Sequence, residues 1–295
     1  MSTTVAPTPA QSTAPVRPHA PKLTFGGILR SEWIKLFTLR STFWCIVIIV
    51  LLSVGFGLLL STVTAPHRAG EPVAAALTTA QQQAQAVSDA TIGAAIGELV
   101  LAVLGVLVIS GEYGTGMIRS TFAAVPKRLP ALFGKAIVLA VTSLVVGLVT
   151  IYGTAAIIFP LLPGKKIHPD WTDWHLNLAL IGGAVYLTLI ALLAFSIGAI
   201  VRNSAGGIAA ALGLILVVPS VFSIVAGTTG AAWAQNVANL LPTSAGAHLY
   251  AYATGKTETV SGILSLDRTA GGLVLLAWVV VVFIIAAVQL KRRDA

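Results

Sequence analysis

Six apolar stretches, each about 20 residues long or longer, constrain this 295-residue chain more than any other feature. A helix rises about 1.5 Å per residue, so about 20 apolar residues cross the roughly 30 Å of hydrocarbon in a bilayer. Hydrophobic residues make up 56% of the chain and charged residues only 9%. A water-soluble globular protein has a larger share of charged residues on its surface. The stretches lie at 41–63, 91–110, 136–159, 176–201, 205–225 and 271–290. The sequence therefore predicts an all-α polytopic membrane protein with six transmembrane helices.

Lysine and arginine residues predict the orientation, because those beside a span are retained on the cytoplasmic side. Of the 18 in the chain, thirteen fall on one face and five on the other. The richer face carries Arg17, Lys22, Arg30, Lys35, Arg40, Arg119, Lys127, Arg128, Lys135, Arg202, Lys291, Arg292 and Arg293. The poorer face carries Arg68, Lys165, Lys166, Lys256 and Arg268. We therefore expect a multi-pass protein of the cell membrane with both termini in the cytoplasm. No nucleic-acid partner is expected, because the basic residues are not gathered on a soluble surface.

The chain divides into three parts. Residues 1–24 are rich in Thr, Pro, Ala and Ser and are predicted to be a disordered cytoplasmic tail. A cleaved signal peptide is not expected there, because the first apolar run begins near residue 41 and is too long for one. Residues 25–40 form an interfacial segment, and residues 41–295 form the six-span domain. The single cysteine, Cys45, excludes an intrachain disulfide.

Residues 25–39 have the spacing of an amphipathic helix that lies along the membrane surface. One face carries Phe25, Leu29, Trp33, Leu36 and Phe37, and the opposite face carries Ser31, Lys35 and Thr38. Trp33 suits the headgroup boundary. Arg30, Lys35 and Arg40 would meet lipid phosphates. The alternative is a basic flank that only fixes topology.

The loop at 111–128 is more elaborate than a turn requires. Gly114 and Gly116 permit a sharp break after the second span. Residues 118–124 can then form a short helix, which Pro126 stops. The exposed apolar side chains of this segment would be Met117, Ile118 and Phe122. Such a helix has the size and chemistry to insert into a groove on a soluble partner.

Three stretches of sequence resemble the permeases of ATP-binding-cassette transporters of the second exporter class, in particular the actinobacterial type. The cytoplasmic loop of that family is similar to Glu112-Tyr113, to Gly114-Thr115-Gly116-Met117-Ile118-Arg119-Ser120-Thr121 and to Pro126-Lys127-Arg128. The family's opening is similar to Ser31-Glu32-Trp33-Ile34-Lys35-Leu36 and Leu39-Arg40-Ser41-Thr42. The run before its last span is similar to Leu240-Leu241-Pro242-Thr243-Ser244-Ala245-Gly246. The likeness covers nearly the whole chain beyond the tail.

The resemblance implies a six-span subunit that forms a homodimer or pairs with a related chain. It implies an elbow helix at 25–39 and a coupling helix near 114–125 that docks on a separate ATPase. Two copies of that ATPase would bind and hydrolyse ATP with Mg²⁺, so this chain would be no enzyme and would bind no cofactor. The ATPase contacts, assigned as a group, would be Glu112, Tyr113, Gly114, Thr115, Gly116, Met117, Ile118, Arg119 and Phe122.

Other candidate sites carry less weight. Gly255-Lys256-Thr257 is no phosphate-binding loop, because Tyr250 occupies the first glycine position and no strand is predicted before it. Glu98 lies inside the second span, where a charge is costly. It is either a cavity-facing carboxylate on a pathway for cations or protons, or a neutral acid that is hydrogen-bonded across the bundle.

Two outer segments also stand out. The first holds His168, Asp170, Asp173 and His175 beside Trp171 and Trp174. We interpret it as a solvated loop with interfacial tryptophans and expect no metal site. In the second, 226–269, helical spacing at 231–241 is interrupted by Pro242 and Gly246. We expect one or two short helices there that dip into the outer leaflet.

The function expected from these patterns is that of the transmembrane subunit of an ATP-driven exporter. A non-transporting membrane anchor or scaffold is an alternative, although the sequence shows no soluble domain. A secondary transporter is another, although buried charges are scarce and no inverted repeat is evident. The sequence leaves the substrate open.

Overall fold

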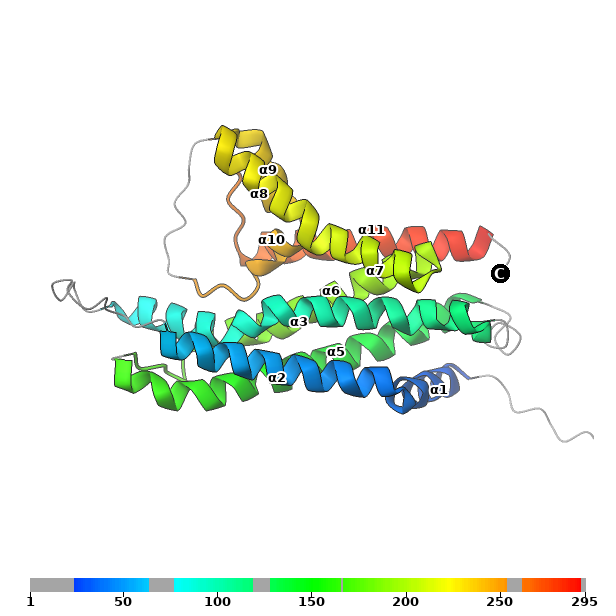
Figure 1. Ribbon diagram of the computed structural model, residues 1–295, viewed down its shortest axis with the longest axis horizontal. Coiled ribbons are helices and arrows are strands. Elements are labelled where there is room, and N and C mark those ends of the chain that lie inside the picture. The colour runs from blue at the N-terminus through cyan, green and yellow to red at the C-terminus, as the bar shows by residue number, and fades with distance from the viewer. Residues whose placement is uncertain (1–23, 64–76, 119–127, 166, 254–261, 293–295) are drawn as a thin grey trace, which may run out of the picture.

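The computed structural model describes residues 24–63, 77–118, 128–165, 167–253 and 262–292 (Figure 1). The described residues form helices and connecting turns, with no strand among them. In chain order the helices are α1 (Phe25–Thr38), α2 (Arg40–Val63), α3 (Thr79–Thr115), α5 (Arg128–Ile158), the 3₁₀ helix η1 (Phe159–Lys165), α6 (Trp174–Val201), α7 (Ser204–Leu212), the π-helical turn η2 (Gly213–Val217), α8 (Val218–Thr229), α9 (Ala232–Leu240), α10 (Pro242–Ala247) and α11 (Arg268–Arg292). The predicted all-α fold is confirmed.

Six helical segments are long and apolar enough to span a membrane, as predicted. They are Arg40–Thr62, Thr79–Thr115, Arg128–Gly164, Trp174–Val201, Ser204–Thr229 and Arg268–Arg292. The second and third are longer than the predicted 91–110 and 136–159, because hydropathy marks the lipid crossing and not the end of the helix. The start of α3 is fixed by a capping box, in which Thr78 accepts a hydrogen bond from the Gln81 amide and the Gln81 side chain bonds back.

The core of the bundle consists of α3, α5 and α6. More than half of the most apolar window of each of these spans is buried, against less than a quarter for the spans of α2, α7–α8 and α11. Figure 1 shows α2, α3, α5 and α6 running side by side, with α7 and α11 along one side of them. The start of α1 and the end of α11 lie at the same end of this bundle, which is the arrangement that an even number of spans requires.

Glycines let the core helices approach closely. A Cβ atom at Gly105 of α3 would collide with the carbonyl oxygen of Ala191 on α6, and one at Gly147 of α5 would lie 3.1 Å from the Cα of Ala184. Contacts as short as these leave no space for a larger residue. The relative positions of α3, α5 and α6 are therefore fixed by backbone contact.

The fifth span changes direction along its length. The chain turns between α6 and α7 at Arg202, whose φ is 58°, and Asn203 caps α7 by accepting a hydrogen bond from the Gly206 amide. The span then passes through the π-helical turn η2 into α8, whose first turn contains Pro219. Proline lacks an amide hydrogen and favours such a deviation. Beyond η2, α8 packs on α9, and both project away from the bundle (Figure 1).

The predicted short helices at 226–269 are present as α9 and α10. Pro242 ends the first and begins the second, because proline is well accommodated in the first turn of a helix. Helix α10 packs against α11 and α6. The position of these helices in the outer leaflet stays a prediction.

We predict that Gly182→Ala destabilises the protein, because a Cβ at this position of α6 would collide with the carbonyl oxygen of Leu249. Overpacking of this kind costs about 1–3 kcal/mol. Gly153→Ala in α5 is the matched control, because a Cβ there meets nothing within 4 Å; it should be neutral or stabilising by about 0.5–1 kcal/mol. Thermal unfolding of the purified protein in detergent measures both. Equal midpoints for the two variants would contradict the close approach of α6 to the segment after α10.

Candidate functional site

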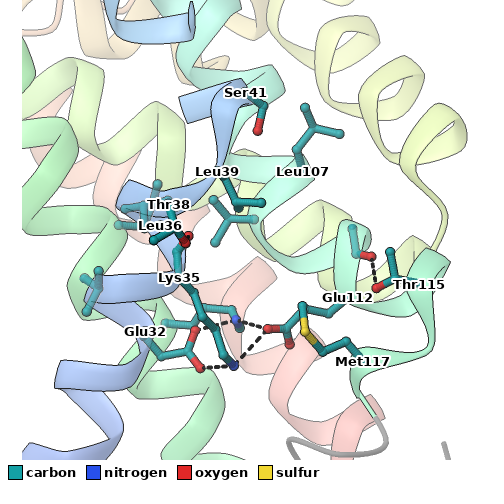
Figure 2. A pocket seen from close by; sticks show the side chains of 15 residues that line it. Glu32, Lys35, Leu36, Thr38, Leu39, Ser41, Leu107, Glu112, Thr115 and Met117 are labelled. Carbon is teal, nitrogen blue, oxygen red and sulfur yellow. Dashed lines mark hydrogen bonds and ion pairs between the residues drawn. The ribbon is translucent and has the colours of Figure 1, made fainter. Parts of the chain in front are cut away.

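Four charged side chains from three helices meet at the end of the bundle where α1 lies (Figure 2). We call them the buried charge cluster: Glu32 and Lys35 of α1, Glu112 of α3 and Lys135 of α5. The Glu32, Glu112 and Lys135 side chains are 4%, 6% and 5% exposed, whereas Lys35 is 33% exposed. Charges so deeply buried require partners, because an unpaired ion in the interior is very unfavourable.

Each carboxylate of the cluster is paired with both ammonium groups. The Nζ atom of Lys135 donates to Oε2 of Glu32 at 2.5 Å and to Oε1 of Glu112 at 2.7 Å. The Nζ atom of Lys35 donates to Oε1 of Glu32 at 2.9 Å and to Oε1 of Glu112 at 3.2 Å. Two positive and two negative charges sum to zero, so the cluster carries no net charge, while Oε2 of Glu112 is buried without a hydrogen bond within the described part of the chain.

The cluster also changes the titration of Lys35. Burial alone would lower the pKa of this lysine, because it disfavours the charged form. Hydrogen bonds and charges from Glu32 and Glu112 outweigh burial and hold the pKa above its ordinary value. Lys35 is therefore a cation throughout the physiological range.

The local sequence of α1 places Glu32 toward the protein. Ile28, Glu32 and Leu36 are the buried residues of this helix and recur at every fourth position, which is one helical face. Ile28 packs against α5, where a Cβ at Gly134 would lie 2.8 Å from its Cγ2 atom. The apolar contact and the ion pair to Lys135 thus come from neighbouring residues of α5.

Three aromatic residues of α1 are exposed at the surface of the protein. Phe25, Trp33 and Phe37 are each exposed by more than two fifths, and the rings of Trp33 and Phe37 lie 4.8 Å apart. Arg30 is exposed beside them. Leu36, which the spacing had placed on the same apolar stripe, is buried in the protein. Contact of Trp33, Arg30 and Lys35 with lipid stays a prediction.

A pocket of about 460 Å³ lies beside the cluster and is lined by the last turns of α1 together with residues of α3 and α5 (Figure 2). Its apolar walls are formed by Leu36, Leu39, Leu107, Val108, Val138 and Leu139. Because this space is not filled by side chains, apolar packing contributes little to holding α1 against α3. The Lys35–Glu112 ion pair connects the two helices directly, and Lys135 of α5 connects them by contacting both Glu32 and Glu112.

The end of α3 leads directly into the predicted coupling segment. Gly114 lies within the helix, so the predicted break comes two residues later, at Gly116, whose φ is 73°. A single glycine inside a helix costs only about 1 kcal/mol, which neighbouring hydrogen bonds outweigh. Thr115 contributes to the last turn by donating to the Gly111 carbonyl oxygen. Tyr113 is half-buried, with the Arg202 guanidinium 5.4 Å from its ring centre.

The residues after Gly116 differ in exposure. Met117 is 44% exposed, as expected of a docking residue, but Ile118 is only 5% exposed. The prediction that Ile118 is exposed is wrong, because its side chain packs among Ile109, Leu132 and other apolar residues of α3, α5 and α11. Glu112 is likewise turned inward, toward the lysines. Arg119 and Phe122 lie outside the described residues.

Glu98 is bonded across the bundle. The hydroxyl of Tyr186 on α6 donates to its Oε2 atom, and the ring of Tyr250 lies 5.2 Å from that of Tyr186. This arrangement matches the alternative in which Glu98 has a structural partner. A pathway role for Glu98 stays a prediction.

The acidic residues of the loop at 168–175 are engaged in local structure. Asp173 caps α6 by accepting from the His175 amide and also accepts from the Tyr252 hydroxyl at 2.7 Å. Asp170 accepts from both the amide and the hydroxyl of Thr172, which lowers the pKa of Asp170. Within the described ranges, no group of three or more His, Cys, Asp or Glu residues could hold a metal ion. Gly255, Lys256 and Thr257 lie outside these ranges.

Sequence reasoning missed the roles of Glu32 and Lys135. Lys135 was interpreted as a topology-determining charge, and Glu32 as part of a motif. One signal was available for Glu32, because it lies four residues from both Ile28 and Leu36 and so on the buried face of α1.

We predict that Lys135→Met destabilises the protein by about 3–5 kcal/mol, because it leaves a buried carboxylate without compensation. The double variant Glu112→Leu/Lys135→Met should recover most of this loss, because it removes one charge of each sign and leaves the Glu32–Lys35 pair intact. Thermal unfolding in detergent compares the two with wild type. A single variant as stable as wild type would show that Lys135 is not held as a buried ion.

Comparison with known proteins agrees with this geometry. Residues 27–295 match the family model described as ABC-2 family transporter protein. No curated protein matches the chain. The match covers every described helix from α2 onward and most of α1. The chain therefore belongs to the ABC-2 transporter family and is a multi-pass membrane permease.

Proposed function

We propose that the chain is the transmembrane subunit of an ATP-driven exporter and that a separate ATPase drives it through the segment that follows Glu112. The observation that carries this proposal is the end of α3. There the helix stops at Gly116, Met117 is exposed, and the buried charge cluster connects the same point to α1 and α5. A site of this kind can receive a docked partner and pass its movement to the spans.

The family supports a partner ATPase, because ABC-2 permeases generally work with one. Family membership also argues against the non-transporting anchor and the secondary transporter. The sparsely buried spans of α2, α7–α8 and α11 present apolar side chains outward. These faces leave room for a second permease copy as well as for lipid.

In the proposed mechanism, ATP binding brings two ATPase subunits together beneath a pair of permeases. Their closure displaces the coupling segment, and α3 and α5, which flank it in sequence, tilt as rigid helices. A path between the two permease copies then opens outward. ATP and Mg²⁺ stay on the ATPase throughout, so this chain performs no chemical step.

The proposed orientation is tested by cysteine labelling in intact cells. In a Cys45→Ser background, Thr172→Cys should react with a membrane-impermeant maleimide from outside, whereas Thr115→Cys should react only after the cells are permeabilised. Both side chains are exposed in the structure, so access depends on the membrane. Labelling of Thr115→Cys in intact cells would reverse the topology and exclude docking of an intracellular ATPase at this segment.

The docking site is tested by Met117→Asp. If Met117 inserts into a groove of the ATPase, a charge there should cost about 2 kcal/mol or more, which is roughly a 30-fold loss of affinity. Co-purification with the partner ATPase measures the loss. Leu264→Asp is the matched control, because Leu264 is 45% exposed and Met117 44%, but Leu264 lies far from α1. Wild-type recovery of the ATPase with Met117→Asp would remove Met117 from the interface.

A further inference from the structure

We propose that Lys135 is a positioning residue that ties α1 to the base of the coupling segment, so that the ATPase moves the interfacial helix together with the two spans. This inference rests on the proposed function and adds a second moving element to it. In the proposed function, the ATPase moves α3 and α5. In this inference, α1 moves together with them at the membrane boundary.

The first support is the place of the ion pair in the chain. Glu112 comes just before the coupling segment, and Lys135 lies after it, about two turns into α5. Their 2.7 Å contact therefore joins the helix before the loop to the helix after it. A displacement of the loop must either move both helix ends together or break a buried ion pair.

The second support is that the same ammonium group also holds α1. Lys135 Nζ lies 2.5 Å from Oε2 of Glu32 while it contacts Glu112. Beside it, Gly134 lies against Ile28, so α1 rests on α5 through an apolar and an ionic contact. Helix α1 packs more extensively on α5 than on α2, although α2 follows it directly in the chain. Helix α1 is therefore attached to the start of α5.

The third support distinguishes Lys135 from Lys35. Both lysines contact Glu32 and Glu112, but the Lys35 side chain is one third exposed, and Lys35 and Glu32 lie three residues apart on one helix. Water can compete for a contact at such a site. The Lys135 side chain is 5% exposed, and in this setting of low dielectric constant its contacts are strong and costly to break. Of the two lysines in the buried charge cluster, Lys135 is therefore the one whose removal should detach α1 from α3 and α5.

The pocket explains why an ionic tie is needed. The pocket of about 460 Å³ is lined by residues of α1, α3 and α5, so α1 and α3 lack there the close packing by which α3 contacts α6. Without the cluster, α1 could change its distance from α3 at little cost in apolar contact. With it, the position of Glu32 follows that of Glu112 through two shared ammonium groups, of which that of Lys135 is the more deeply buried.

The experiment uses the complete complex with its ATPase in lipid nanodiscs and measures spin-label distances in a Cys45→Ser background. One pair joins Arg30→Cys on α1 to Trp174→Cys at the far end of α6, and a second pair joins Thr115→Cys on α3 to Trp174→Cys. In the otherwise wild-type complex, ATP with vanadate should shift both distances. In Glu112→Leu/Lys135→Met, the shift of the Thr115 pair should persist, and the shift of the Arg30 pair should fall by at least half.

Lys35→Met is the matched control, because it removes a lysine of the same cluster and should keep most of the Arg30 shift. An Arg30 shift of full size in the double variant would overturn the inference and leave the proposed function intact. Loss of both shifts in the double variant would also overturn it, because the cluster would then support the fold and not the transmission. Absence of a Thr115 shift in the wild-type background, with ATP hydrolysis retained, would instead contradict the proposed coupling function itself.

Discussion

The burial of one ammonium group between two carboxylates determines how three helices meet. Removing Lys135, Glu32 and Glu112 from water is costly, and their mutual attraction compensates only while the geometry is kept. The apolar contact of α1 with α5 centres on Ile28, Ala131 and Gly134. The position at which α1 meets the bundle therefore depends on the charges as well as on packing.

The opposite end of the bundle is held by different means. Gln83 of α3 donates to the carbonyl oxygen of His168 and accepts from the amide of Asp170, which fixes the loop at 168–175 onto α3. Gly182 brings the segment after α10 into direct contact with α6. These contacts are made by amide, carbonyl and glycine groups, which carry no net charge, whereas buried ions join α1, α3 and α5 at the other end.

The number and order of the spans followed from the sequence, because the thickness of the hydrocarbon sets the length of each apolar stretch. The ends of the helices did not, since α3 continues through the polar residues after Thr78 and through Gly114. Local hydrogen bonds decide those limits, and hydropathy does not measure them. The helices α9 and α10 were predictable from spacing and from Pro242, although the departure of α8 from the bundle was not.

The sequence predicted which segment contains the candidate site, but it did not predict the contacts between the side chains there. The loop motif pointed to Met117, and the spacing of α1 gave its exposed aromatic face. Glu32 and Lys135, however, lie 103 residues apart in sequence, and no single-sequence pattern pairs charges over such a distance. The burial of Ile118 was missed for the same reason, because the residues that cover it come from α5 and α11 as well as from α3.

The length of α3 gives the buried charge cluster its mechanical significance. The helix runs unbroken for 37 residues, which at about 1.5 Å per residue is about 55 Å. A continuous helix resists bending, and Gly105, in the C-terminal third of α3, lies against α6. In the proposed mechanism, a displacement at Gly116 therefore rotates α3 about this contact and does not dissipate near the loop. Glu112 lies within the last turn of α3. When this end of the helix moves, the lysines paired with Glu112 must therefore move with it, or the ion pairs must break. The cluster thus decides whether the interfacial helix takes part in the movement of the spans.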